Sequence, residues 1–476
     1  MVVLGQPDIQ IRCPPEKAPY KEGESMAQYE SFSFNTLDEL RRKVDSLGLP
    51  ISFSDNLGIL AGSAQVGRRI APNRFSTLPM EGRDSLPDGT PGDLTFRRYR
   101  RYGAGGWGLI QFEACAVWQG GRSSDRQMCI GASTEKAIAS LLEETRKAAM
   151  AAFGSSHAPL CLLQLQDAGR YRHATGTTPG LTVRYPLLDR RAKVPEDVEP
   201  LSDADIEAVQ DRMVEAAVRA EKIGFDGIDI KSCHRYLGSE LLAAHLRSGR
   251  FGGDFEGRTR FLRDLTGRIR SAVSNPEFLV TSRMNLFDGF PYPYGWGCDR
   301  SDPPLPDMSE PLKLLGILKE LGLELLTTST GTPYYNPWLV RPFDRLIPGN
   351  IEAPEHPLEG VARLFSLTET VQTAFPDLPV TGSGYTWLRH FGVFAAASNV
   401  ARKAVTFAGF GRTGFAYPDL PRDVLEKGAV DPKKTCVSCS LCSEVMSQGG
   451  PTGCYAKDRE VYGPLLKEHR ASRKAY

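Results

Sequence analysis

The chain has 476 residues, and its 58 lysines and arginines nearly balance its 57 aspartates and glutamates. The resulting net charge of +1 gives no reason to expect nucleic acid or an anionic membrane as a partner. Hydrophobic residues make up 41% and charged residues 24% of the chain, a composition typical of folded soluble proteins, which excludes wholesale disorder. No apolar run approaches the roughly 20 residues of a membrane span, and the first residues lack the basic and then apolar order of a secretory signal, so we expect a cytoplasmic protein.

Short apolar runs alternate with amphipathic helical patterns along most of the chain. One helix is well marked, because Ser202 and Asp205 predict a capped start and Gly224 predicts its end. Repeated strand–helix alternation predicts an α/β fold, a parallel (β/α)8 TIM barrel, with a doubly wound open sheet as the alternative. The predicted strands are 68–80, 108–117, 159–166, 226–231, 278–284, 324–330, 379–384 and 403–411.

The carboxyl ends of barrel strands are where active sites form. Two of the predicted ends are rich in glycine, namely Gly382-Ser383-Gly384 and Gly409-Phe410-Gly411-Arg412. Free backbone N–H groups after the last two strands, with an arginine beside them, predict a phosphate-binding site. No GxGxxG fingerprint opens a strand–helix unit, so we do not expect a second, dinucleotide-binding domain.

The most informative strand end is that of 226–231, where Lys231 is followed closely by His234 and Tyr236. Lysine and histidine can donate hydrogen bonds to a carbonyl oxygen that gains negative charge. Tyr236 stays protonated at neutral pH and can deliver a proton to a carbanion. Either His234 or Tyr236 alone could be a packed loop residue, but the three together at a strand end favour a catalytic site.

This segment resembles the old yellow enzyme family of FMN-dependent oxidoreductases, whose fourth strand ends in His-x-x-His/Asn-x-Tyr. The resemblance covers about residues 68–460 and includes Asn73-Arg74, Glu113-Ala114 and the Gln-Leu-x-x-x-Gly-Arg run at 164–170. It implies that Pro79 and Met80 line the isoalloxazine ring, that Ala114 and Gln164 bind its pyrimidine edge, and that Arg283 neutralises charge at N1 and O2. It implies that the phosphate is held by Gly382, Ser383, Gly384, Gly411 and Arg412.

Departures from the family pattern at Lys231, Glu81, Asp167 (usually histidine) and Gly257 (usually asparagine) leave the substrate and the direction of electron flow open. Lys231 stands where the family usually has histidine, so the carbonyl clamp would be Lys231 and His234. Glu81 stands where threonine or cysteine commonly tunes the flavin. A carboxylate at that position could lower the flavin potential or simply face water.

Four of the ten cysteines crowd together near the end of the chain. Three cysteines spaced by two residues, with a remote fourth, are typical of a [4Fe–4S] cluster, and structural zinc is the alternative. The pattern also resembles the iron–sulfur branch of the family, which includes 2,4-dienoyl-CoA reductase and trimethylamine dehydrogenase. Relatives there usually continue into nucleotide-binding domains, whereas the cysteines here lie near the end of the chain. We therefore expect NAD(P)H or a separate electron-transfer protein as the redox partner. The predicted ligands are Cys436, Cys439, Cys442 and Cys454.

These features divide the chain into three parts. They are an N-terminal arm (1–65), an FMN-binding barrel (66–425), and an iron–sulfur segment with the C-terminal tail (426–476). The other cysteines are scattered, which indicates a reducing compartment rather than a disulfide framework. We also expect a homo-oligomer.

The expected function is an ene-reductase, in which hydride passes from reduced FMN to a carbonyl-conjugated alkene and Tyr236 donates the proton. One alternative is an amine dehydrogenase resembling trimethylamine dehydrogenase, which an aromatic bowl of Tyr334, Tyr335 and Trp338 would favour through cation–π contacts. The other alternative is a zinc-bearing barrel that binds a phosphorylated ligand without redox chemistry. The aromatic loop 285–308 either covers the flavin with this bowl or packs on the barrel rim.

Overall fold

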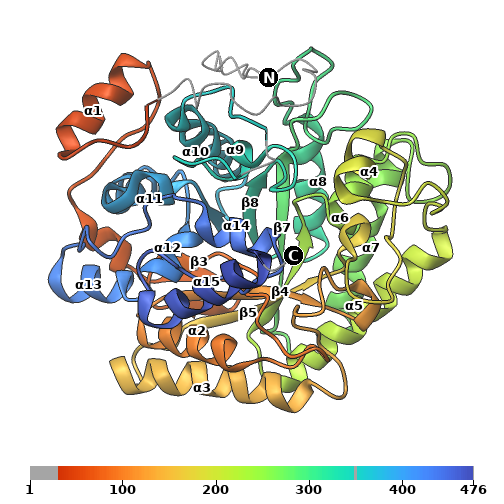
Figure 1. The fold of residues 1–476 in the computed structure, drawn as a ribbon, viewed down its shortest axis with the longest axis horizontal. Coiled ribbons are helices and arrows are strands. Elements are labelled where there is room, and N and C mark those ends of the chain that lie inside the picture. Colours follow the sequence, from red (N-terminus) through yellow and green to blue (C-terminus); the bar gives the residue numbers. More distant parts are fainter. Residues whose placement is uncertain (1–29, 348–350, 475–476) are drawn as a thin grey trace.

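A closed barrel of eight parallel strands forms the centre of the molecule (Figure 1). The computed structural model describes residues 30–347 and 351–474. The predicted barrel is therefore confirmed, and the open sheet is excluded because β10 pairs with both β9 and β3. The barrel strands are β3 (Phe75–Thr77), β4 (Leu109–Ala116), β5 (Leu160–Gln166), β6 (Gly227–Ser232), β7 (Leu279–Phe287), β8 (Leu325–Thr330), β9 (Val380–Gly382) and β10 (Phe407–Phe410).

The strands are apolar along much of their length because a parallel barrel buries both faces of each strand. Every residue of these eight strands is buried. An antiparallel hairpin of β1 (Ala64–Val66) and β2 (Arg69–Ala71) precedes the barrel. Its buried side chains Val66 and Ala71 pack with Leu109 and Leu160, which begin β4 and β5, so the hairpin closes the amino-terminal end of the barrel.

Helices surround the barrel and connect its strands. Helix α5 (Asp203–Ile223) begins with the predicted capping box, because Ser202 Oγ accepts a hydrogen bond from the Asp205 N–H and the Asp205 carboxylate accepts one from the Ser202 N–H. It ends at Gly224, whose φ of 102° suits glycine. The other helices are α1 (Leu37–Ser46), α2 (Asp93–Ala104), α3 (Glu135–Phe153), α4 (Pro186–Ala192), α6 (Leu237–Leu242), α7 (Phe255–Ala272), α8 (Ser309–Glu320), α9 (Pro337–Val340), α10 (Pro357–Ala374), α11 (Gly392–Ala401), α12 (Arg412–Ala416), α13 (Leu420–Lys427), α14 (Leu441–Ser447) and α15 (Arg459–Lys474).

The expected N-terminal arm lies partly outside the described residues, which begin at Glu30. Its described part contains α1, at the edge of the molecule in Figure 1, and is joined to the barrel domain by an aromatic anchor. Phe32 is buried, and its ring centroid lies 5.3 Å from that of Trp387. The Phe32 N–H also donates to the carboxylate of Asp344.

The cysteine-bearing C-terminal segment packs on the barrel domain through α14 and α15, drawn in blue in Figure 1. Arg97 of α2 donates two hydrogen bonds to Asp458, at 2.6 and 2.9 Å. Arg83, which follows β3, donates to the backbone oxygen of Met446 in α14 at 2.9 Å. Among the residues that the structure describes, no helix is both long and apolar enough to cross a membrane.

Candidate functional site

The three residues predicted at the end of β6 lie together at the carboxyl end of the barrel. Lys231 and Tyr236 are both buried, and the Lys231 ammonium lies 3.5 Å from the centre of the Tyr236 ring. His234 turns across to β8, where its Nε2 lies 2.9 Å from Ser329 Oγ. The site thus has an ammonium, an imidazole and a phenol at the ends of β6 and β8.

Burial sets the protonation of these groups. It lowers the pKa of Lys231 to about 8, so the ammonium form still predominates at neutral pH. Burial, with the nearby charges of Arg283 and Lys231, lowers the pKa of His234 well below its usual value, and the imidazole is neutral. Burial raises the pKa of Tyr236 well above 10, so its hydroxyl keeps its proton. Each group is therefore a hydrogen-bond donor near neutral pH.

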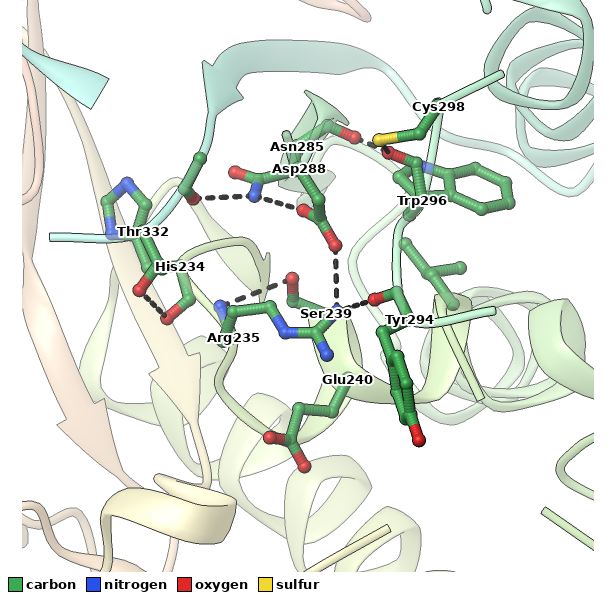
Figure 2. Close-up of polar contacts among 12 residues, drawn as sticks. His234, Arg235, Ser239, Glu240, Asn285, Asp288, Tyr294, Trp296, Cys298 and Thr332 are labelled. Carbon is green, nitrogen blue, oxygen red and sulfur yellow. Dashed lines mark hydrogen bonds and ion pairs between the residues drawn. The ribbon is translucent and has the colours of Figure 1, made fainter. Parts of the chain in front are cut away.

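A buried ion pair holds the His234–Tyr236 segment in an unusual backbone conformation. His234 and Arg235 have φ values of 64° and 62°, in the left-handed region that non-glycine residues rarely adopt. The Arg235 guanidinium donates to Asp288 Oδ2 at 2.8 Å and to the backbone oxygen of Tyr294 at 3.1 Å (Figure 2). Thr332 donates to the backbone oxygen of His234 at 3.1 Å. These contacts tie the strained turn after β6 to the loops that follow β7 and β8.

Asp288 is itself held on several sides. Asn285 donates to its Oδ1 at 2.6 Å, and the Asp288 N–H donates to the Trp296 backbone oxygen at 2.9 Å (Figure 2). The Trp296 indole N–H in turn donates to the Asn285 backbone oxygen at 3.0 Å. The predicted aromatic loop 285–308 thus begins within β7, which extends to Phe287, and its next residue, Asp288, holds Arg235.

The expected aromatic bowl does not form from the predicted residues. Tyr334 lies in the site, with its hydroxyl 3.0 Å from the Tyr236 hydroxyl. Tyr335 packs instead against Phe290, at 5.1 Å between centroids, and Trp338 is buried in the hydrophobic core. Tyr171 stacks on Tyr334 at 3.9 Å. Tyr171 is not among the predicted site residues. The only feature of the sequence that could have pointed to it is its place in the loop directly after a predicted strand.

Glu81 lies in a hydrogen-bonded network rather than simply facing water, and its effect on the flavin potential stays a prediction. Ser123 donates to its Oε1 at 2.7 Å and Gln127 to its Oε2 at 3.2 Å. The Arg83 Nε lies 3.4 Å from Oε1. Because Arg83 also contacts α14, this network joins the site to the cysteine-bearing segment.

The predicted pyrimidine-edge residues lie at the ends of β4 and β5. The Gln164 amide donates to Asp229 at 2.6 Å. Burial raises the pKa of Asp229 to about 6. The Ala114 backbone oxygen accepts from Gln127 at 3.0 Å, so Gln127 bridges Ala114 and Glu81.

The predicted flavin-binding residues include buried donors that suit an anionic ligand. Arg283 donates to the Pro79 backbone oxygen at 3.4 Å, and its Nε has no hydrogen-bond partner among the described residues. Arg412 Nη1 likewise has no hydrogen-bond partner among the described residues, whereas Arg412 Nη2 donates to the Pro342 backbone oxygen at 2.7 Å. Such buried donors are costly unless a ligand or water accepts from them.

Glycines bring the backbone close together at the predicted phosphate site. A Cβ at Gly409 would lie 2.5 Å from the Gly382 backbone oxygen, and one at Gly411 would lie 3.2 Å from the Met80 sulfur. Gly384 has a φ of 106°, which suits glycine alone. Ser383 lies between Gly382 and Gly384 and is buried. The glycines therefore allow β9, β10 and Met80 to pack closely on one another at the predicted phosphate site.

All four cysteines of the C-terminal segment line one small cavity that is partly open to solvent. Ser438 and Ser440, between the first three cysteines, have φ values of 53° and 57°. Arg412 lines the same cavity. In the described part of the chain, no three histidine, cysteine or acidic side chains are arranged so that they could hold a metal ion.

Comparisons with known proteins place these features in context. The model of the NADH:flavin oxidoreductase / NADH oxidase family matches residues 64–292. The chain is 32% identical over 268 residues to an NADPH dehydrogenase of Bacillus pumilus, covering 54% of this chain and 69% of that protein. It is 24% identical over 408 residues to the dimethylamine dehydrogenase of a Hyphomicrobium species, covering 82% of this chain but only 49% of that protein.

A solved structure of 2-naphthoyl-CoA reductase with 2-naphthoyl-CoA has a similar fold, with a TM-score of 0.68. The sequences are 18% identical, and the match covers 85% of this chain and 57% of that chain. At this identity the likeness concerns the fold alone.

Proposed function

Since the chain belongs to the NADH:flavin oxidoreductase / NADH oxidase family and is therefore an FMN-dependent oxidoreductase of the old yellow enzyme type, we propose that it is an ene-reductase that uses NAD(P)H and acts on a carbonyl-conjugated alkene. The observation that carries the proposal is the buried phenol of Tyr236 beside the Lys231 ammonium and near His234. Family membership also shows that the non-redox alternative, a zinc-bearing phosphate-binding barrel, is wrong.

The proposed FMN site fits the donors and glycines described above. Arg283 Nε and Arg412 Nη1 are buried donors that the flavin and its phosphate would satisfy. When bound, FMN supplies the hydride that adds to the β-carbon of the alkene. The proposed FMN-binding residues are Pro79, Met80, Glu81, Ala114, Gln164, Arg283, Gly382, Ser383, Gly384, Gly411 and Arg412.

The chain's own residues would then polarise and protonate the substrate. Lys231 and His234 donate hydrogen bonds to the carbonyl oxygen, which stabilises the negative charge that develops there. Tyr236 donates its hydroxyl proton to the α-carbon. The amine-dehydrogenase alternative loses its support from an aromatic bowl, because Tyr335 packs against Phe290 and Trp338 lies in the hydrophobic core.

The expected result for this proposal is alkene reduction without amine oxidation. Protein purified without oxygen and reduced with NADPH should be reoxidised by cyclohexenone, as followed by the recovery of flavin absorbance. The oxidised protein mixed with dimethylamine should keep that absorbance. Bleaching by dimethylamine together with no reoxidation by enones of several sizes would contradict the proposal.

We further propose that the four cysteines hold a [4Fe–4S] cluster, which exchanges single electrons with a separate redox protein. All four line one cavity, which supports a shared ligand. The cytoplasmic location, the homo-oligomer and the domain boundaries stay predictions from the sequence.

Replacing Cys439 with serine is expected to remove the iron and to leave the flavin bound. The wild-type protein should contain about four iron atoms and four acid-labile sulfides per chain, as expected for this cluster type. Cys298→Ser is the matched control, because Cys298 is also partly buried but lies in the loop after β7. One zinc per chain and no iron in the anaerobic wild-type protein would contradict the cluster.

A further inference from the structure

The proposed proton donor is almost sealed from solvent. Tyr236 is only 2% exposed, yet a phenol that gives up its proton in every turnover must regain one from solvent each time. Its hydroxyl forms a 3.0 Å hydrogen bond with the hydroxyl of Tyr334, which is half-buried. Tyr334 is therefore a hydrogen-bonded neighbour of the donor that is more exposed to solvent than the donor itself.

We propose that Tyr334 relays protons from solvent to Tyr236. This inference rests on the proposed ene-reductase function and adds a second phenol to it. As the new C–H bond forms at the α-carbon, the O–H bond of Tyr236 breaks. The proton of the Tyr334 hydroxyl moves to the Tyr236 oxygen, and Tyr334 takes a proton from water. Each turnover consumes one solvent proton by this route, and no electrons move along it.

Both phenols keep their protons near neutral pH. Burial raises the pKa of both phenols, that of Tyr334 to about 12. With both hydroxyls protonated at rest, the phenolate that Tyr236 becomes on giving up its proton is the base that draws the proton from Tyr334 across their 3.0 Å hydrogen bond. The positive charge of Arg83 lowers both pKa values, whereas the negative charge of Glu81 raises both.

The position of Tyr334 is fixed independently of Tyr236. Its ring stacks on that of Tyr171 at 3.9 Å, with 23° between the ring planes. Its backbone oxygen accepts from Arg191 Nε at 3.0 Å, and its N–H donates to Thr332 Oγ1 at 3.4 Å. The Tyr334 hydroxyl is thus held at Tyr236 by contacts that do not involve the hydroxyl itself.

Tyr334→Phe is expected to slow alkene reduction by roughly tenfold or more, since positioned proton transfer contributes at least that much. Tyr171→Phe is the matched control, because it keeps the stacked ring and removes a hydroxyl that has no hydrogen-bond partner among the described residues. The rate of alkene reduction is measured at several fractions of D₂O. In the wild type and the control, we expect the rate to depend on the D₂O fraction along a curve, because two protons move in the step. In Tyr334→Phe we expect a linear dependence. Equal rates and equal curvature in the two variants would overturn the relay.

A second measurement does not depend on alkene turnover. Three-fluorotyrosine placed at position 334 of the holoenzyme reports its ionisation through its ¹⁹F chemical shift. If the two hydroxyls share a proton, Tyr236→Phe should raise the pH at which this fluorotyrosine ionises. An unchanged titration would overturn the relay even if the protein reduces alkenes. A raised titration in a protein that reduces no alkene would support the shared proton and contradict the proposed function alone.

Discussion

Replacing Asp288 with alanine is expected to destabilise the folded protein by about 3–5 kcal/mol, the effect of leaving a buried charge without its partner. Arg235 is 1% exposed and Asp288 fully buried, and the two form a 2.8 Å ion pair (Figure 2). Without Asp288, the guanidinium would keep one backbone oxygen, that of Tyr294, as its acceptor among the described residues. The free energy of unfolding is measured by urea denaturation.

Asp377→Ala is the control for this prediction. Asp377 pairs with Lys319 at 2.6 Å, but its side chain is 71% exposed, so its loss should leave the stability almost unchanged. The double variant Arg235→Gly, Asp288→Ala should be more stable than Asp288→Ala alone. It removes the unpaired charge, and glycine suits the φ of 62° at position 235. Equal urea midpoints for Asp288→Ala and Asp377→Ala would contradict the role of the ion pair.

The barrel could be predicted from the sequence because its signals are local. Strands buried on both faces read as apolar runs, and the helix caps are contained in a few adjacent residues. The run 68–80 is the exception, since it was predicted as one strand and forms β2 and β3. Pro72 lacks an N–H for the ladder, and the Asn73 side chain donates to the Gly106 backbone oxygen at 2.8 Å and accepts from the Phe75 N–H at 3.0 Å. The chain therefore bends between the closing hairpin and the barrel.

The site could be predicted only where its residues share one strand end. Lys231 lies near the end of β6, and His234 and Tyr236 follow it within four residues of its end, so their spacing is informative. The partner of Arg235 could not be found in this way, because Asp288 follows another strand, β7. For Tyr334 and Tyr335, in contrast, closeness in the sequence is misleading. They are neighbours in the sequence, but one packs with Tyr171 and the other with Phe290.

Replacing Tyr236 with phenylalanine is expected to slow alkene reduction by about 10²–10⁴-fold, the usual contribution of a positioned general acid. The reduction of the flavin by NAD(P)H should keep its wild-type rate, because no proton from Tyr236 is needed in that half-reaction. Stopped-flow absorbance measures the two half-reactions separately. The Lys231 ammonium, 3.5 Å from the Tyr236 ring, should stay in place because the ring is retained.

The comparison of the two half-reactions makes this prediction specific to proton donation. If the substitution only disturbed the packing of the site, both half-reactions would slow together. Tyr171→Phe serves again as the control, since it removes a hydroxyl from the same aromatic cluster. An alkene half-reaction that proceeds at the wild-type rate in Tyr236→Phe would assign the proton to another donor. His234 would then be the residue to test, because its neutral imidazole lies at the same strand end.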